Sequence, residues 1–106
     1  MEKQRYEVIG TLNNNGVVAK DELNKEVILL GKGIGFKRKA GDVIDNPGKN
    51  IKCYSLEKNT GKNVLQGVDP IFLEIANEII RYAEKEFGDI DTKILLPLAD
   101  HIAFSI

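Results

Sequence analysis

The residues best suited to bind a ligand lie in one glycine-rich and basic stretch, Gly31–Phe36, and in the cluster Lys37–Lys39 that follows it. Glycine lets a backbone approach a ligand closely, basic side chains neutralise phosphates, and an aromatic ring such as Phe36 stacks on an unpaired base. A phosphate-binding loop of the nucleotide enzymes is not indicated, because no helical periodicity follows Phe36 and the glycine spacing fits neither common motif. The stretch favours RNA as the ligand, and a solvated basic loop is the alternative.

Three consecutive asparagines, Asn13–Asn15, form a second cluster of polar side chains. Their amides can both donate hydrogen bonds to base edges and accept them, a capacity that charged side chains lack. Asparagine is also common in turns for purely conformational reasons, so the cluster alone leaves both interpretations open. Together with the basic stretch, it predicts nucleic-acid binding at the mouth of a hairpin.

No group of residues supports catalysis or metal binding. The lone histidine, His101, has no serine or cysteine nucleophile in a recognisable context, and the acidic residues near Glu84 and Asp89 suit a solvated helix end. The single cysteine, Cys53, cannot form an internal disulfide, and one cysteine with one histidine cannot make a standard four-ligand zinc site. We therefore expect a protein that is not an enzyme and has no cofactor or metal.

The composition bounds the size and the surroundings of the chain. Its 106 residues, 42% hydrophobic and 29% charged, suit one modest domain or two very small ones. No apolar run approaches the ~20 residues that span a bilayer, and the N-terminus lacks an apolar signal core, so we expect a cytoplasmic protein.

The net charge of -1 conceals two halves of opposite sign. Residues 1–58 carry 11 lysines and arginines against 8 aspartates and glutamates, giving +3. Residues 59–106 carry 4 against 8, giving -4, and the two values add to -1. The basic half is the one that attracts an anionic partner.

The basic half has the periodicity of short β-strands. Four segments rich in β-branched and aromatic residues are separated by turn residues such as Asn15-Gly16. They span residues 5–9, 16–19, 26–30 and 51–56. This pattern predicts a four-stranded antiparallel sheet in meander order. No helix falls within residues 1–58 to cover a face of the sheet, so we expect it to form a homodimer, closing a barrel or sandwich with a second copy.

The acidic half has helical periodicity. Asp69 can cap a first helix, Pro70 suits its first position and Gly88 suits its end, while Pro97 predicts the start of a second helix. The apolar stripe of the first helix consists of Ile71, Phe72, Ile75, Ala76, Ile79, Ile80, Ala83 and Phe87. The predicted fold class is therefore α+β, with a β domain at 1–58, a linker at 59–68 and two helices of a truncated all-α domain at 69–106.

Three ordered motifs cover nearly the whole chain. They are Leu12-Asn13-Asn14-Asn15, then Lys25-Glu26-Val27 to Gly31-Lys32-Gly33-Ile34-Gly35-Phe36 with Gly41-Asp42-Val43-Ile44, and finally Leu98-Ala99-Asp100-His101-Ile102-Ala103-Phe104. The first two resemble the co-antiterminator RNA-binding domain of the BglG/SacY/LicT family of bacterial transcriptional antiterminators. The last resembles the first histidine motif of that family's phosphotransferase-system regulation domains.

The resemblance implies a dimeric regulator that binds a hairpin in a nascent transcript and stops an overlapping terminator hairpin from forming. On the matching positions it implies an RNA surface, joined across the dimer, made of Asn14, Asn15, Gly31, Lys32, Gly33 and Phe36. Two positions depart from the family pattern. Gly10 replaces a basic residue and Gly16 replaces a branched apolar one, so we expect one phosphate contact fewer and a looser hairpin.

The resemblance also implies that His101 is phosphorylated by proteins of the sugar phosphotransferase system. A surface histidine without a function is the plain alternative. For the whole chain, one alternative is a protein-interaction module, a small β dimer with a helical docking arm that binds no RNA. Another is a phosphocarrier enzyme that uses His101. Salt-dependent binding to an RNA hairpin separates the predicted function from both.

Overall fold

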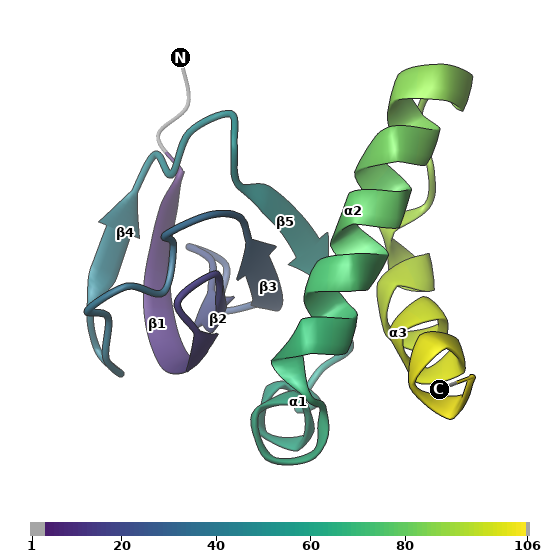
Figure 1. The fold of residues 1–106 in the computed structure, drawn as a ribbon. Coiled ribbons are helices and arrows are strands. Elements are labelled where there is room, and N and C mark those ends of the chain that lie inside the picture. The colour runs from purple at the N-terminus through teal and green to yellow at the C-terminus, as the bar shows by residue number, and fades with distance from the viewer. Residues whose placement is uncertain (1–3, 106) are drawn as a thin grey trace.

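The computed structural model describes residues 4–105, which form a five-stranded sheet followed by helices (Figure 1). The strands are β1 (Arg5–Asn13), β2 (Gly16–Lys20), β3 (Glu26–Leu30), β4 (Val43–Asp45) and β5 (Lys52–Ser55). The helices are α1 (Gly61–Gly67), α2 (Pro70–Phe87), the short 3-10 helix η1 (Thr92–Ile94) and α3 (Leu95–Phe104). Residues 1–3 and 106, which the predicted domain boundaries include, lie outside the described residues. The expected α+β class is confirmed.

The sheet has one strand more than the sequence pattern predicts. Its order is β4-β1-β2-β3-β5, and every neighbouring pair is antiparallel. The additional strand, β4, has only three residues and lies between turn residues, so its β pattern is too short to stand out in the sequence. It pairs with the start of β1, where Tyr6 lies opposite Ile44. The prediction of four strands is therefore wrong by one edge strand.

Both faces of the sheet are covered within the chain. One face packs against its own loop and edge strand, in a cluster of Tyr6, Val8, Val17, Ala19, Val27, Leu29, Ile34 and Ile44. The opposite face packs against the helices, in a cluster of Val18, Ile28, Leu30, Tyr54, Val64, Leu73, Ala76, Ile80, Leu95 and Ala99. The expectation that a face is left for a second copy does not hold for residues 4–105, because the helices beyond residue 58 fold back onto it (Figure 1).

A short helix, α1, forms within the range predicted as a linker. The carboxylate of Glu26 accepts hydrogen bonds from the backbone N–H groups of Asn59 at 3.0 Å and Gly61 at 2.6 Å, which satisfies donors at the start of this helix. A Cβ on Gly61 would come within 2.5 Å of Glu26, and one on Gly10 within 2.9 Å of Leu65. These two glycines therefore let α1 lie close to the sheet. At seven residues, α1 is too short to give a helical stripe in the sequence.

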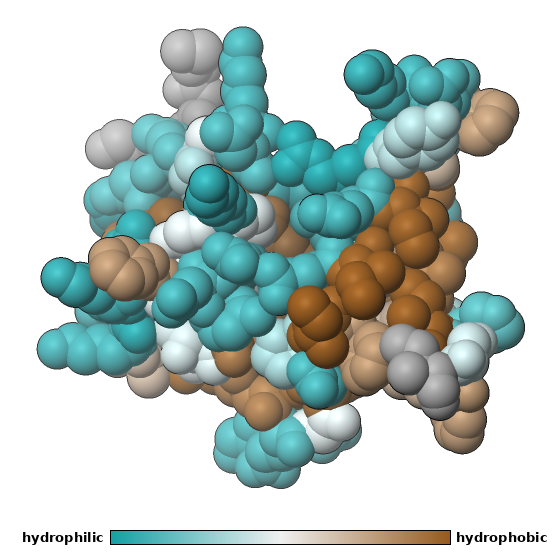
Figure 2. All heavy atoms as spheres, viewed as in Figure 1, coloured by the Kyte–Doolittle hydropathy of each residue, from teal (hydrophilic) through white to brown (hydrophobic). Residues whose placement is uncertain are grey.

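The long helix α2 begins and ends where the sequence predicts. The side chain of Asp69 accepts a hydrogen bond from the N–H of Ile71 at 3.1 Å, Pro70 is the first helical residue and Gly88 follows the last. Only part of the predicted apolar stripe is buried. The buried residues of α2 are Leu73, Ala76, Asn77 and Ile80, whereas Ile71, Ile79 and Phe87 are exposed. Figure 2 shows apolar surface, coloured brown, on the helical half of the molecule.

The last helix, α3, begins at Leu95, two residues before the predicted start at Pro97. It follows η1, which Asp91 caps by accepting a hydrogen bond from the N–H of Lys93 at 2.9 Å. The expectation of two helices is therefore wrong, because α1 and η1 are added to α2 and α3. None of the helices formed by residues 4–105 is long and apolar enough to cross a membrane.

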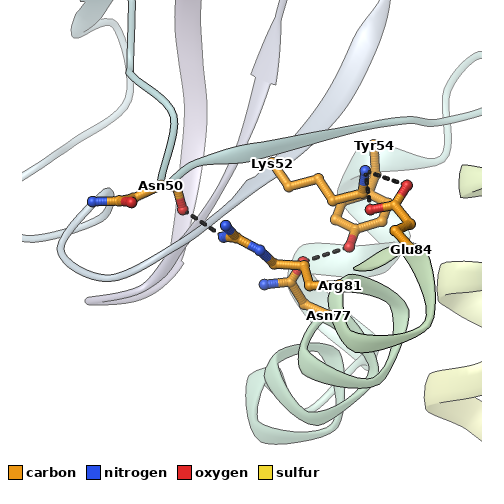
Figure 3. Close-up of polar contacts among 6 residues, drawn as sticks. All are labelled: Asn50, Lys52, Tyr54, Asn77, Arg81 and Glu84. Atoms are coloured by element: carbon orange, nitrogen blue, oxygen red, sulfur yellow. Dashed lines mark hydrogen bonds and ion pairs between the residues drawn. The ribbon is translucent and has the colours of Figure 1, made fainter. Parts of the chain in front are cut away.

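A buried polar pair lies inside the contact between α2 and the sheet. The hydroxyl of Tyr54 on β5 donates to the side-chain oxygen of Asn77 on α2 (Figure 3). Tyr54 is fully buried and Asn77 is only 8% exposed. Burial, with a smaller effect from the nearby carboxylate of Glu84, raises the pKa of Tyr54 above its usual value, so this hydroxyl keeps its proton at neutral pH.

Two further polar contacts join α2 to the sheet and to the turn before β5. The ammonium of Lys52 pairs with the carboxylate of Glu84 at 3.0 Å, and Arg81 donates to the backbone oxygen of Asn50 at 2.9 Å (Figure 3). Residues 77, 81 and 84 lie on one face of the helix because they are separated by four and three positions. That face is the one that meets β5 and the turn before it.

Candidate nucleic-acid interface

The tip of the hairpin between β1 and β2 is held by its own asparagines. The side-chain oxygen of Asn13 accepts a hydrogen bond from the backbone N–H of Asn15 at 2.8 Å. Asn13 pairs with Gly16, where a Cβ would come within 2.9 Å of the side chain of Leu30. Gly16, one of the two departures from the family pattern, is therefore closely packed against β3.

The glycine-rich stretch folds as consecutive turns. The N–H of Ile34 donates to the backbone oxygen of Gly31 at 3.2 Å, and that of Phe36 to Gly33 at 3.1 Å. Gly33 has a φ of 82°, a conformation that favours glycine. The side chain of Ile34 is buried in the core, whereas the ring of Phe36 is 57% exposed and the ammonium of Lys37 lies 5.4 Å from its centroid. This ring is free to stack on a base beside a charge that can meet a phosphate.

Three hydrogen bonds tie the hairpin tip to this loop. The N–H of Gly31 donates to the backbone oxygen of Asn15 at 3.0 Å, that of Gly35 to the backbone oxygen of Asn14 at 2.9 Å, and that of Gly33 to the side-chain oxygen of Asn15 at 3.0 Å. Gly35 approaches the hairpin so closely that a Cβ would lie 2.0 Å from the backbone oxygen of Asn13. The hairpin tip and the loop therefore form one surface, which we call the hairpin–loop surface (residues 13–16 and 31–36).

Basic side chains surround the hairpin–loop surface. Lys32, Lys37 and Lys39 are exposed, and Arg38 is half-buried. The segment Val27–Gly41 contains no acidic residue, so this loop itself carries positive charge that attracts phosphates. On the side of α2, Glu74 and Glu78 line a cleft together with Lys32. Within residues 4–105, no three histidine, cysteine, aspartate or glutamate side chains gather in a group that could hold a metal ion.

The structure brings the predicted RNA-contacting residues together. All of them lie in the hairpin tip or in the loop tied to it, namely Asn14, Asn15, Gly31, Lys32, Gly33 and Phe36. They come from a single chain, so the expected joining across a dimer is not needed to assemble the surface. His101 lies elsewhere, exposed on α3.

Three more residues contribute to the surface. Asn13 and Gly35 belong to the motifs already singled out, and the repeated glycines were the available signal for the close approach of Gly35. Glu74 on α2 is the third, because its carboxylate accepts hydrogen bonds from the side-chain amides of Asn13 and Asn15, each at 2.8 Å. Glu74 lies 59 positions from Asn15, and no local pattern in the sequence marks it.

The chain is similar to proteins of one family. Residues 6–63 match the family model described as the CAT RNA binding domain. Transcription antiterminator LicT of Bacillus subtilis (strain 168) is 31% identical over 100 residues, which are 90% of this chain and 36% of LicT. Protein GlcT of Staphylococcus haemolyticus (strain JCSC1435) is 33% identical over 105 residues, which are 94% of this chain and 37% of GlcT. The chain thus spans little more than a third of the length of these curated relatives.

A solved structure is similar over almost the whole chain. The structure described as the crystal structure of GlcT CAT-PRDI matches with a TM-score of 0.73 and 34% sequence identity. The match covers 94% of this chain and 62% of that one. The similarity therefore extends beyond the β half and into the helices.

Replacing Gly35 with alanine is expected to disrupt the hairpin–loop surface, because the new Cβ would overlap the backbone oxygen of Asn13. Overpacking of this kind typically costs about 1 to 3 kcal/mol of unfolding free energy, and a backbone atom cannot rotate away to relieve it. Urea unfolding followed by circular dichroism measures the loss. Gly67→Ala is the control, since no atom lies within 4 Å of its Cβ position. Equal stability of the two variants would contradict the close approach.

Proposed function

The chain belongs to the CAT RNA-binding domain family, and we propose from this that it is the RNA-binding part of a transcriptional antiterminator. The family resemblance carried by the sequence motifs is thereby confirmed. In the proposed function, the chain binds a hairpin in nascent mRNA and prevents a terminator hairpin from forming. The observation that carries the proposal is the family match over residues 6–63, the part of the chain that contains the hairpin–loop surface.

The chemistry of the surface supports RNA as the ligand. Sequence-specific RNA recognition targets unpaired bases, which need aromatic faces for stacking and amide groups for hydrogen bonding to base edges. Phe36 offers the exposed ring, the asparagines offer the amides and Lys32 offers a charge for phosphate. No bond is made or broken in this function, so the proposed role is binding and not catalysis.

We also propose that phosphorylation at His101 regulates the protein. The side chain is exposed on α3, where a donor protein of the phosphotransferase system can reach it. A phosphoryl group adds a charge of about -2 to an acidic half and so changes how helical elements pack. From the family resemblance we also propose the division into a β domain at 1–58, a linker at 59–68 and a helical part at 69–106.

We propose that the β domain, residues 1–58, forms a homodimer when the helices do not cover its sheet. In residues 4–105 the helices cover the face of Val18, Ile28 and Leu30, and removing them would expose that face. Exposed apolar surface of this kind is stabilised by pairing with a second copy, at about 25 cal/mol for each Å² buried.

Lys32→Ala and Phe36→Ala are expected to weaken RNA binding in different ways. Loss of the lysine should reduce the slope of log affinity against log salt by about one, and loss of the ring should cost about 1 to 3 kcal/mol. Filter binding to a hairpin selected from a pool of bulged RNA hairpins, with DNA of the same sequence as control, measures both. Lys62→Ala and Phe104→Ala remove an exposed lysine and an exposed phenylalanine from the helical half and should leave affinity unchanged. Unchanged affinity for both surface variants would place the RNA site elsewhere.

Residues 1–58 alone are expected to form a homodimer, because the sheet face that the helices cover is then free. Sedimentation at tens of micromolar protein should give the mass of two chains. Circular dichroism verifies that the sheet is retained. A folded monomer at this concentration would rule out dimerisation through the sheet.

Incubation with phosphorylated proteins of the phosphotransferase system is expected to label His101. Mass spectrometry of the intact chain should show one phosphoryl group, which is absent from His101→Ala. The same variant should bind the selected RNA hairpin with unchanged affinity, because His101 lies on α3 and not in the hairpin–loop surface. Undiminished labelling of His101→Ala would show that another residue is phosphorylated. Loss of RNA binding by the folded variant would show that His101 belongs to the RNA site.

A further inference from the structure

Two side-chain amides of the hairpin–loop surface, those of Asn13 and Asn15, each donate a hydrogen bond within the chain. One oxygen of the Glu74 carboxylate, Oε2, accepts from Nδ2 of Asn13 at 2.8 Å, and the other, Oε1, accepts from Nδ2 of Asn15 at 2.8 Å. Glu74 is half-buried on α2. A single anion therefore spans both amides, as two oxygens of one phosphate group could do. Hydrogen bonds to an ionised acceptor are stronger than those between neutral groups.

The side-chain oxygens of the two asparagines each accept a hydrogen bond within the chain as well. The side-chain oxygen of Asn13 accepts from the backbone of Asn15, and that of Asn15 accepts from Gly33. Both oxygens thus hold the hairpin–loop surface together, which leaves their NH₂ groups as the outward donors. Each NH₂ group has two hydrogens and Glu74 accepts one from each, so an RNA acceptor that takes either of these two hydrogens must displace the carboxylate.

Glu74 is held in place by the docking of α2. Asn77, one turn further along the helix, is fixed by the buried hydroxyl of Tyr54, and Leu73 is buried against the sheet. A cleft of about 310 Å³ between the loop and α2 is lined by Asn15, Leu30, Gly31, Lys32, Glu74, Asn77 and Glu78. The docked helix therefore presents two carboxylates to a basic surface from which phosphates would be repelled at this short range.

We propose that Glu74 is an internal competitor for RNA at the amides of Asn13 and Asn15. With α2 docked and Glu74 in place, one hydrogen of each amide is closed to RNA, and binding that uses both hydrogens requires the carboxylate to leave. This inference rests on the proposed RNA-binding function and adds a form of autoinhibition to it. The part of the chain that competes belongs to the helical half, which couples RNA binding to any event that moves α2.

Glu74→Gln tests the competition in the chain of residues 1–106. Glutamine keeps the size of the side chain but has one acceptor oxygen in place of two and carries no charge. Glu78→Gln is the matched control, because Glu78 is exposed and lines the same cleft. Among the hydrogen bonds of residues 4–105, those of Asn13 and Asn15 to a carboxylate go to Glu74 and not to Glu78. Affinity for the selected RNA hairpin should rise about tenfold for Glu74→Gln, as expected for loss of a charge-assisted contact, and less than about threefold for Glu78→Gln.

A second measurement tests the contact without RNA. The side-chain amide signals of Asn13 and Asn15 in nuclear magnetic resonance spectra should move in Glu74→Gln and stay in place in Glu78→Gln. Unmoved signals would overturn the inference, since the carboxylate would then not hold these amides in solution.

The outcomes separate the inference from the function on which it rests. If the chain binds RNA, Phe36→Ala weakens that binding, and Glu74→Gln and Glu78→Gln behave alike, then the competition alone is wrong. If neither the unaltered chain nor Glu74→Gln retains any hairpin, the proposed function fails and the competition fails with it. A tenfold gain in RNA affinity in Glu74→Gln that is lost when Asn13→Ala is added to the same chain supports both the function and the competition.

Discussion

The place of α2 on the sheet depends on one buried polar pair, the hydroxyl of Tyr54 and the side-chain amide of Asn77. An unpaired polar group in an apolar contact costs about 1 to 3 kcal/mol, so α2 cannot shift by a turn without leaving two such groups unpaired. With Asn77 fixed, the helical repeat sets Glu74 beside the asparagine hairpin and Arg81 beside the backbone of Asn50. The register of one helix thereby decides which side chains face the hairpin–loop surface.

The hairpin–loop surface itself depends on close approach of backbones. Gly35 fits against Asn13 only because it has no side chain, and the hydrogen bonds between loop and hairpin follow from that approach. The buried side chain of Ile34 anchors the loop in the core, which leaves Phe36 and the lysines exposed on a fixed base. A ligand therefore meets groups that are already in position, and little conformational entropy is lost when it binds.

Local patterns in the sequence predict much of this fold and little of how its parts meet. Asp69, Pro70 and Gly88 bound α2 correctly, because capping depends on residues next to the helix end. The strand Val43–Asp45 and the helix Gly61–Gly67 are too short for a periodic signal. The motifs locate the asparagines and the glycine loop, but the contact of Glu74 with Asn15 joins positions 59 residues apart. Such a contact follows from packing, which a single sequence does not reveal.

We propose that residues 13–16 and 31–36 together form one RNA-binding surface. Titration of the isotope-labelled chain with the selected RNA hairpin, followed by nuclear magnetic resonance, tests it residue by residue. We expect the largest changes on the ring of Phe36 and on the backbone amides of Asn15, Gly31, Gly33 and Gly35. Changes confined to the exposed apolar residues of α2 and α3, with these amides unmoved, would contradict it.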